Sequence, residues 1–259
     1  RYSSLSAGQL FLPACTSNTL KSKVFFRTVP SDEASGKKLA DYAKNKLRVN
    51  KVAIFYNPDD TTYSTSLQKA FESHFQQLGG QVVRKISLNK SNLNAQDKIK
   101  SLSDQVSAIL LFPDVNSTDK AVQVAKANFT LQGQKLQLLG GDALYQLNTL
   151  NEGGKALDGL VLAIPWFSNS QNYAREAETR WRGGISWRTA TSFDASIALI
   201  KALSGTNPTR VTVLQNLQST NLLSEETSGA AVQFSSAGNL NREPVLVEVV
   251  NGNFQLAQP

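Results

Sequence analysis

The sequence predicts an α/β protein built on a mostly parallel sheet that helices cover on both faces. Three observations predict this fold class. Short apolar runs alternate with segments of helical periodicity, each run is closed by Pro or Gly residues, and 41% of the 259 residues are apolar against 18% charged. The alternation is typical of βαβ units, whose strands are buried on both faces. The composition excludes a disordered chain, and no apolar run is long enough to cross a membrane.

The first part of the chain repeats one strand–helix unit. The run 51–56 (KVAIFY) is a buried strand that Asn57-Pro58 closes, and the helix that follows it ends at Gly79-Gly80. The other elements expected before residue 166 are strands at 24–29, 81–88, 107–112, 135–139 (stopped at Gly140-Gly141) and 159–164, and helices at 33–47, 94–102, after Ser117 or Thr118, and at 143–150.

The pattern changes after Pro165. Helices are expected first, at 172–181, 191–203 and 208–217, and strands follow at 231–234, 244–250 and 254–256. Asn251-Gly252 predicts a tight hairpin turn between the last two strands, because both residues tolerate positive φ.

Several classes of function are excluded or disfavoured by what the sequence contains. The net charge of +7 comes from scattered basic residues rather than a basic stripe, which argues against nucleic-acid binding. Phosphate-binding glycine loops, dinucleotide fingerprints and nucleophile elbows do not occur. The single histidine, His74, lies mid-helix and is interpreted as structural, and the single cysteine, Cys15, allows neither an internal disulfide nor, with one histidine, a usual zinc site. No enzyme activity, metal or cofactor is therefore predicted.

Ligands of open α/β sheets lie beyond the carboxyl ends of the strands. This rule selects the loops 13–17, 57–64, 113–117 and 140–143, which are rich in hydroxyls and carboxylates and contain no histidine. Asp142 follows a strand end directly, where it either binds an ammonium group or caps a helix. Tyr63 is either the wall of a cleft or simply the start of a helix. Carboxylate chemistry at Asp114 and Asp142 leaves an α/β enzyme as a further alternative.

Five short segments, in order along nearly the whole chain, resemble the branched-chain amino-acid-binding family, the type I periplasmic solute-binding proteins of ABC importers. They are Phe11-Leu12-Pro13-Ala14-Cys15-Thr16-Ser17, Phe26-Arg27-Thr28-Val29-Pro30-Ser31-Asp32, Val52-Ala53-Ile54-Phe55 with Tyr63, Gly140-Gly141-Asp142, and Thr191-Ser192-Phe193-Asp194-Ala195.

The resemblance implies a periplasmic-binding-protein-like fold of type I, with two Rossmann-like lobes, parallel sheets and an incomplete first lobe. Lobe 1 would contain residues 1–31 and 166–240, and lobe 2 residues 32–165 and 241–259. The implied function is to trap an amino acid or similar small zwitterion between the lobes and deliver it to a membrane ABC permease. The chain would be a monomer, periplasmic or anchored to a membrane facing the periplasm. An extracellular sensing domain of a receptor is the alternative.

The resemblance also implies roles for particular residues. Ala14, Cys15 and Thr16 match the loop that holds the ligand carboxylate, and Asp142 matches the acid that receives the ammonium. Tyr63 matches an aromatic wall. Asp114 stands where relatives often carry an aromatic residue, which favours a polar or cationic ligand side chain, and Arg188 lies near a further pocket position.

Overall fold

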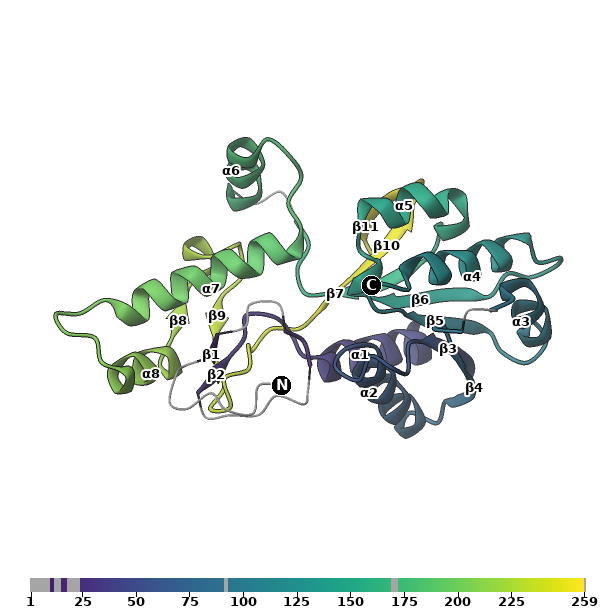
Figure 1. The fold of residues 1–259 in the computed structure, drawn as a ribbon, viewed down its shortest axis with the longest axis horizontal. Helices are drawn as coiled ribbons and strands as arrows, with labels where there is room; N and C mark the ends of the chain where they lie inside the picture. The colour runs from purple at the N-terminus through teal and green to yellow at the C-terminus, as the bar shows by residue number, and fades with distance from the viewer. Residues whose placement is uncertain (1–9, 12–14, 18–23, 91–92, 169–171, 259) are drawn as a thin grey trace. The chain divides into compact units, whose positions relative to one another are not determined.

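A computed structural model describes residues 10–11, 15–17, 24–90, 93–168 and 172–258 (Figure 1). The chain divides by its internal contacts into two compact units. Unit 1 consists of Arg1–Ser31, so far as it is described, and Pro165–Glu243, and unit 2 consists of Asp32–Ile164 and Pro244–Pro259. In the described part of the chain, every helix is too short or too polar to cross a membrane.

Unit 2 is built on a seven-stranded sheet in the order β11-β10-β7-β6-β5-β3-β4. The strands β3, β4, β5, β6 and β7 run parallel to one another, whereas β10 is antiparallel to β7 and β11 is antiparallel to β10. Their bounds are Lys51–Tyr56 (β3), Gln81–Ser87 (β4), Ala108–Phe112 (β5), Gln137–Gly141 (β6), Val161–Ile164 (β7), Val245–Val250 (β10) and Asn253–Leu256 (β11). The predicted parallel sheet is confirmed.

Helices lie on both faces of this sheet, with α1 and α2 on one side and α4 and α5 on the other (Figure 1). The interior strand β5 is buried at every position, as its unbroken apolar run predicts. The helical segments of unit 2 are α1 (Asp32–Asp41), the π-helix η1 (Tyr42–Lys46), α2 (Ser64–Gln77), α3 (Ala95–Leu102), α4 (Thr118–Thr130), η2 (Asp142–Leu144), α5 (Leu147–Gly153) and η3 (Gly154–Leu157).

Unit 1 contains a small core on the long helix α7 (Trp187–Leu203). Alanines on one face of α7 pack with apolar side chains of α8 (Arg210–Gln218) and of the short strands β2, β8 and β9. The remaining elements of this unit are β1 (Leu10–Phe11), β2 (Phe25–Phe26), α6 (Asn172–Trp181), β8 (Asn221–Leu222), η4 (Ser224–Glu226) and β9 (Val232–Gln233).

Three details differ from the sequence-based expectations. The strand expected at 24–29 is reduced to Phe25–Phe26, and the helix expected at 33–47 divides into α1 and η1. Gly140 and Gly141 do not stop their strand but belong to β6. A Cβ on Gly140 would lie 2.9 Å from side-chain atoms of Leu144 and Leu162, so glycine here serves close packing rather than termination.

The predicted hairpin turn is confirmed. Asn251 and Gly252 both have positive φ, at 50° and 73°, as a tight hairpin between β10 and β11 requires. His74 Nε2 lies 3.0 Å from Asp41 Oδ1 and so links α2 to the end of α1, and the structural role of His74 stays a prediction.

Candidate functional site

The carboxyl ends of the parallel strands meet at one edge of the unit 2 sheet. Tyr56 at the end of β3 pairs with Phe112 at the end of β5, and Gly141 at the end of β6 pairs with Ala163 in β7. After β3, the chain forms β4 on one side of β3 and then β5 on the other side. The direction in which strands are added to the sheet therefore reverses at β3. Such a reversal opens a crevice above the strand ends in α/β sheets. The loops that follow β3, β5 and β6 are therefore the candidate site of this unit.

Asp60 shapes the loop that leads from β3 into α2. Its carboxylate accepts hydrogen bonds from the backbone N–H groups of Thr62 (3.1 Å), Tyr63 (3.2 Å) and Ser64 (3.0 Å). Burial alone would raise the pKa of Asp60, but these hydrogen bonds outweigh it and hold the pKa below its usual value. Asp60 thus stays ionised and holds the beginning of α2, and with it Tyr63.

The Tyr63 hydroxyl connects the start of α2 to the end of β6. It accepts a hydrogen bond from the Ala143 backbone N–H at 3.1 Å and is hydrogen-bonded to the Asp142 side chain. Gly141 makes room for it, since a Cβ at that position would overlap the hydroxyl. Tyr63 therefore stands at a helix start and also reaches the predicted recognition acid.

Two buried carboxylates influence the Tyr63 hydroxyl. Burial, followed by the charge of Asp142 and more weakly that of Asp32, raises the pKa of Tyr63 well above its ordinary value. The hydroxyl therefore stays protonated and donates to Asp142, leaving that carboxylate as an oriented acceptor. Asp142 is 8% exposed and Asp32, the first residue of α1, is 1% exposed. Such a negative, largely buried group suits a cationic group such as ammonium.

Asp142 is not the cap of the helix that it begins. The cap of η2 is Gly141, and no side chain caps the helix. Of the two roles that the sequence left open for Asp142, the structure thus removes helix capping.

Asp114 lies just beyond β5, in the turn before α4. Its backbone N–H donates to Ser117 Oγ at 3.2 Å, and its Oδ1 accepts from the same hydroxyl. The side chain is half-buried and at the same sheet edge as Asp142. Its contacts among the described residues are those of a turn, and its predicted contact with a ligand side chain remains a prediction.

In unit 1, the predicted carboxylate loop is organised by the buried guanidinium of Arg27. Arg27 Nη1 donates to the carbonyl oxygens of Cys15 (3.4 Å), Thr16 (3.0 Å) and Ser17 (2.8 Å), while Nε donates to Asn239 Oδ1. In a trans peptide the N–H points opposite to the preceding C=O. The N–H groups of Thr16 and Ser17 therefore point away from the guanidinium, an orientation that suits an anion.

Two other predicted residues are placed differently. Ala14 lies outside the described residues. Arg188 is the second residue of α7, and its guanidinium stacks on the ring of Trp187 at 4.2 Å from the ring centroid. Its predicted contact with a ligand remains untested.

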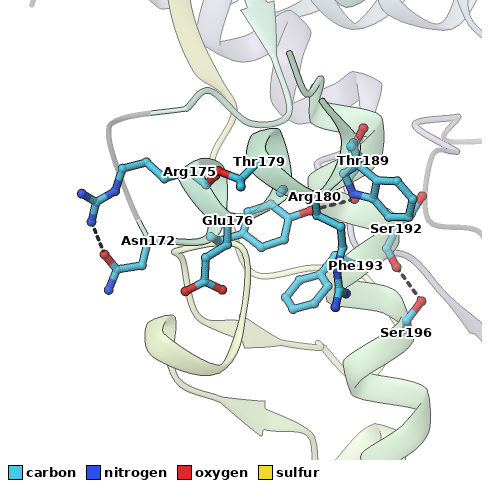
Figure 2. A pocket seen from close by; sticks show the side chains of 12 residues that line it. Asn172, Arg175, Glu176, Thr179, Arg180, Thr189, Ser192, Phe193 and Ser196 are labelled. Atoms are coloured by element: carbon cyan, nitrogen blue, oxygen red, sulfur yellow. Dashed lines mark hydrogen bonds between the residues drawn. The ribbon is translucent and has the colours of Figure 1, made fainter. Parts of the chain in front are cut away.

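A cavity of about 1010 Å³ lies elsewhere in unit 1, between α6 and α7 (Figure 2). Tyr173 and Phe193 form an aromatic pair there, with ring centroids 4.6 Å apart. Its charged side chains, Arg175, Glu176 and Arg180, are all exposed. No predicted ligand residue lines this cavity, and exposed charges hold a small polar ligand weakly. We therefore do not regard it as the main site.

Sequence reasoning gave no individual site role to three residues that shape these regions: Asp32, Gly141 and Arg27. Asp32 resembles an ordinary acid in the first turn of a helix. Gly141 was interpreted as a strand stop, although glycine within a strand also signals close approach of another group. Arg27 had no distinguishing signal, because its partners are carbonyl groups at other points of the chain.

Comparisons with known proteins agree with this architecture. A model of the periplasmic binding protein family matches residues 5–253. No curated protein matches the chain.

Solved structures with a similar fold include three amino-acid-related proteins. A leucine binding protein from Thermotoga maritima is 20% identical with a TM-score of 0.78, covering 91% of this chain and 67% of that one. An ABC transporter substrate-binding protein from Desulfitobacterium hafniense in complex with Leu is 18% identical with a TM-score of 0.76, covering 95% and 72%. A branched chain amino acid ABC transporter from Thermus thermophilus with bound valine is 16% identical with a TM-score of 0.77, covering 97% and 72%.

The fold of the expected family is thereby confirmed. The match of the family model extends over nearly all of both units, including the strand edge with Asp142 and the loop around Thr16. The chain belongs to the periplasmic binding protein family.

Proposed function

We propose that the chain is a solute-binding protein that captures an amino acid or similar small zwitterion on the periplasmic side of a membrane and delivers it to an ABC permease. The observation that carries this proposal is the largely buried Asp142 carboxylate, which the neutral Tyr63 hydroxyl orients at the carboxyl edge of the sheet. The fold and the family are those of binding proteins rather than enzymes.

The two ends of a zwitterion match the chemistry of the two described regions. The ammonium group would contact Asp142, in a charge-assisted hydrogen bond within a largely buried setting. The carboxylate would contact the N–H groups of Thr16 and Ser17, which the Arg27 guanidinium turns outward by holding the carbonyls. Because Arg27 is itself only 4% exposed, its role is to orient the loop rather than to meet the ligand directly.

Amino acids are favoured over other zwitterions by the relatives. The Desulfitobacterium hafniense and Thermus thermophilus proteins of similar fold hold leucine and valine. For this chain, the predicted roles of Cys15, Asp114 and Arg188 are part of the same proposal: Cys15 in the carboxylate loop, and the other two near the ligand side chain.

Calorimetry with a panel of amino acids tests the proposal. We expect at least one amino acid to bind, and Asp142→Asn to weaken that binding by roughly 2–5 kcal/mol if a buried ammonium loses its charged partner. Asp119→Asn is the matched control, because Asp119 is an exposed acid on α4 of the same unit. A panel without a single amino-acid ligand, together with binding of a sugar or a nucleotide, would refute the proposal.

A modified ligand assigns the contact more sharply. The N-acetyl derivative of the bound amino acid lacks the ammonium group, so we expect it to bind weakly. Asp142→Asn should then have little further effect, because the group that Asp142 recognises is already absent. Full additivity of the two changes would contradict the assigned role of Asp142.

A further inference from the structure

The chain passes between its two units three times, after Ser31, after Ile164 and after Glu243. We call the stretches 28–32, 165–168 and 242–246 the connecting segments. On the unit 1 side, each connecting segment carries a side chain that is hydrogen-bonded either to α7 or to Ser228, which is itself hydrogen-bonded to Asp194 of α7. These contacts converge on two positions of α7, Thr191 and Asp194, which are one turn apart.

Asp194 is the charged centre of these contacts. Its side chain is fully buried, and its two oxygens accept hydrogen bonds from Ser228 N (2.7 Å) and Ser228 Oγ (2.9 Å). Oδ2 also accepts from Nη1 and Nη2 of Arg242, each at 3.2 Å. Burial raises the pKa of Asp194, and the Arg242 charge and the Ser228 hydrogen bonds oppose that rise.

The third connecting segment is held directly by this carboxylate. Arg242 begins the segment, and its side chain is 11% exposed. Besides pairing with Asp194, its Nη2 donates to the carbonyl oxygens of Ala230 (2.6 Å) and Ala231 (3.2 Å). Loss of the Asp194 charge would leave a largely buried guanidinium with only neutral acceptors, which is unfavourable.

The other two segments are held through one further residue or through the helix backbone. Trp166 Nε1, in the second segment, donates to the carbonyl oxygen of Ser228 at 3.0 Å, and Ser228 is in turn bound by Asp194. Thr28 Oγ1, in the first segment, donates to the carbonyl oxygen of Thr191 at 2.8 Å. Trp166 and Thr28 are both buried, so water does not compete freely for these bonds.

We propose that Asp194 is a positioning residue: it fixes the second and third connecting segments against α7 and thereby sets the affinity of the chain for its ligand. The effect on affinity rests on the proposed binding function, whereas the anchoring does not. Binding proteins close around their ligands by hinge motion, and hinges are a few residues in connecting segments. Connecting segments that are fixed at their unit 1 ends limit the conformations that the ligand-free chain can adopt. Less conformational entropy is therefore lost when the ligand binds.

The test combines hydrogen exchange, followed by mass spectrometry, with calorimetry on the amino acid that the wild type binds. For Asp194→Asn we expect faster amide exchange in 165–168 and 242–246, with exchange in β3 and β5 unchanged. We also expect the dissociation constant to rise about fivefold or more, the lower end of couplings between distant sites. A role in stability alone would lower the unfolding temperature without changing the dissociation constant of the folded protein.

Two milder variants and a control accompany this variant, and they suffice if Asp194→Asn does not fold. Thr28→Val removes one hydroxyl and should speed exchange in 28–32 only, and Trp166→Phe keeps an aromatic ring but removes the bond to Ser228. Both should weaken binding in the same direction as Asp194→Asn. Glu226→Gln is the control, since Glu226 of η4 forms an exposed ion pair with Lys201 of α7. This substitution should change neither measurement.

The outcomes separate the two proposals. If the wild type binds no amino acid, the proposed function fails, and the exchange data alone decide whether Asp194 anchors the segments. If the wild type binds but the variants keep its dissociation constant, the positioning role is overturned. Exchange that rises throughout unit 1 rather than in the connecting segments overturns the anchoring itself.

Discussion

At the scale of single residues, Tyr63 has two hydrogen-bonding roles with one oxygen. The hydroxyl accepts from Ala143 N and donates to Asp142, so it fixes both the backbone of η2 and the acid at its first position. The second role depends on the hydroxyl staying protonated, which burial and the nearby carboxylates ensure by raising its pKa. A phenylalanine side chain at this position would fill the same space but would orient neither Ala143 N nor the Asp142 carboxylate.

Tyr63→Phe is therefore expected to weaken amino-acid binding and to lower the free energy of unfolding by about 1–2 kcal/mol, since Ala143 N loses its acceptor. Calorimetry and urea unfolding measure the two effects. Tyr42→Phe on η1 removes a hydroxyl from the same unit away from the site and should leave affinity unchanged. Equal affinities for wild type and Tyr63→Phe would show that Asp142 needs no orientation by Tyr63.

Gly141 is the second residue on which this arrangement depends. Gly141→Ala places a methyl group where the Tyr63 hydroxyl and a Leu67 methyl already lie, and we expect it to lower the free energy of unfolding by about 1–3 kcal/mol. Gly183→Ala is the control, because no atom lies within 4 Å of the added methyl group and φ is not positive there. Thermal unfolding of both variants checks this, and an equal loss in both would contradict the packing argument.

At the scale of elements, the beginning of α2 depends on a side chain four residues earlier than its first residue. Asp60 accepts from the backbone N–H groups of Thr62, Tyr63 and Ser64, which lead into α2 and have no partner within the helix. The helix α2 thus begins where Asp60 places it, and Tyr63 is held at the position just before the first residue of α2.

Asp60→Ala should lower the free energy of unfolding by roughly 0.5–2 kcal/mol at pH 7, the usual range for a lost helix cap. The pKa of Asp60 is lowered in the folded chain, so its contribution is present above the unfolded value of about 4 and is lost as the pH falls through the folded value. Urea unfolding of both proteins from pH 7 to pH 3 should therefore show a difference that shrinks with acid. A difference that does not vary with pH would contradict the charge argument.

At the scale of the whole molecule, ligand binding and stability are linked. A ligand that binds only the folded chain raises the free energy of unfolding by about 2.7 kcal/mol at one hundred times its dissociation constant. We expect a matching rise in the unfolding temperature of the wild type with its amino acid, and a much smaller rise for Asp142→Asn at the same concentration. Scanning calorimetry measures both, and equal rises would indicate that the ligand binds away from Asp142.

The candidate site was only partly predictable for a reason visible in its residues. Asp142 could be selected because it follows a strand directly, and strand ends are recognisable from local apolar runs. The contact between Tyr63 and Asp142 could not be predicted, because the two residues are far apart in sequence and come together only through the strand order β3-β5-β6. The contacts of Thr28 and Arg242 with α7, and of Trp166 with Ser228, likewise join residues far apart in sequence and could not be predicted.

The sequence by itself determined most of the strands and helices of unit 2, the hairpin at Asn251-Gly252 and the loops at which we expect a ligand to be recognised. Hydrophobic periodicity and turn residues act through residues that are close together in the chain, so a short stretch of sequence is enough to recognise them. Only the tertiary structure decided that Gly141 admits the Tyr63 hydroxyl, that Arg27 holds three loop carbonyls, and that Asp194 is bound to Ser228 and Arg242. Those contacts join residues far apart in sequence, whose meeting depends on how whole elements pack.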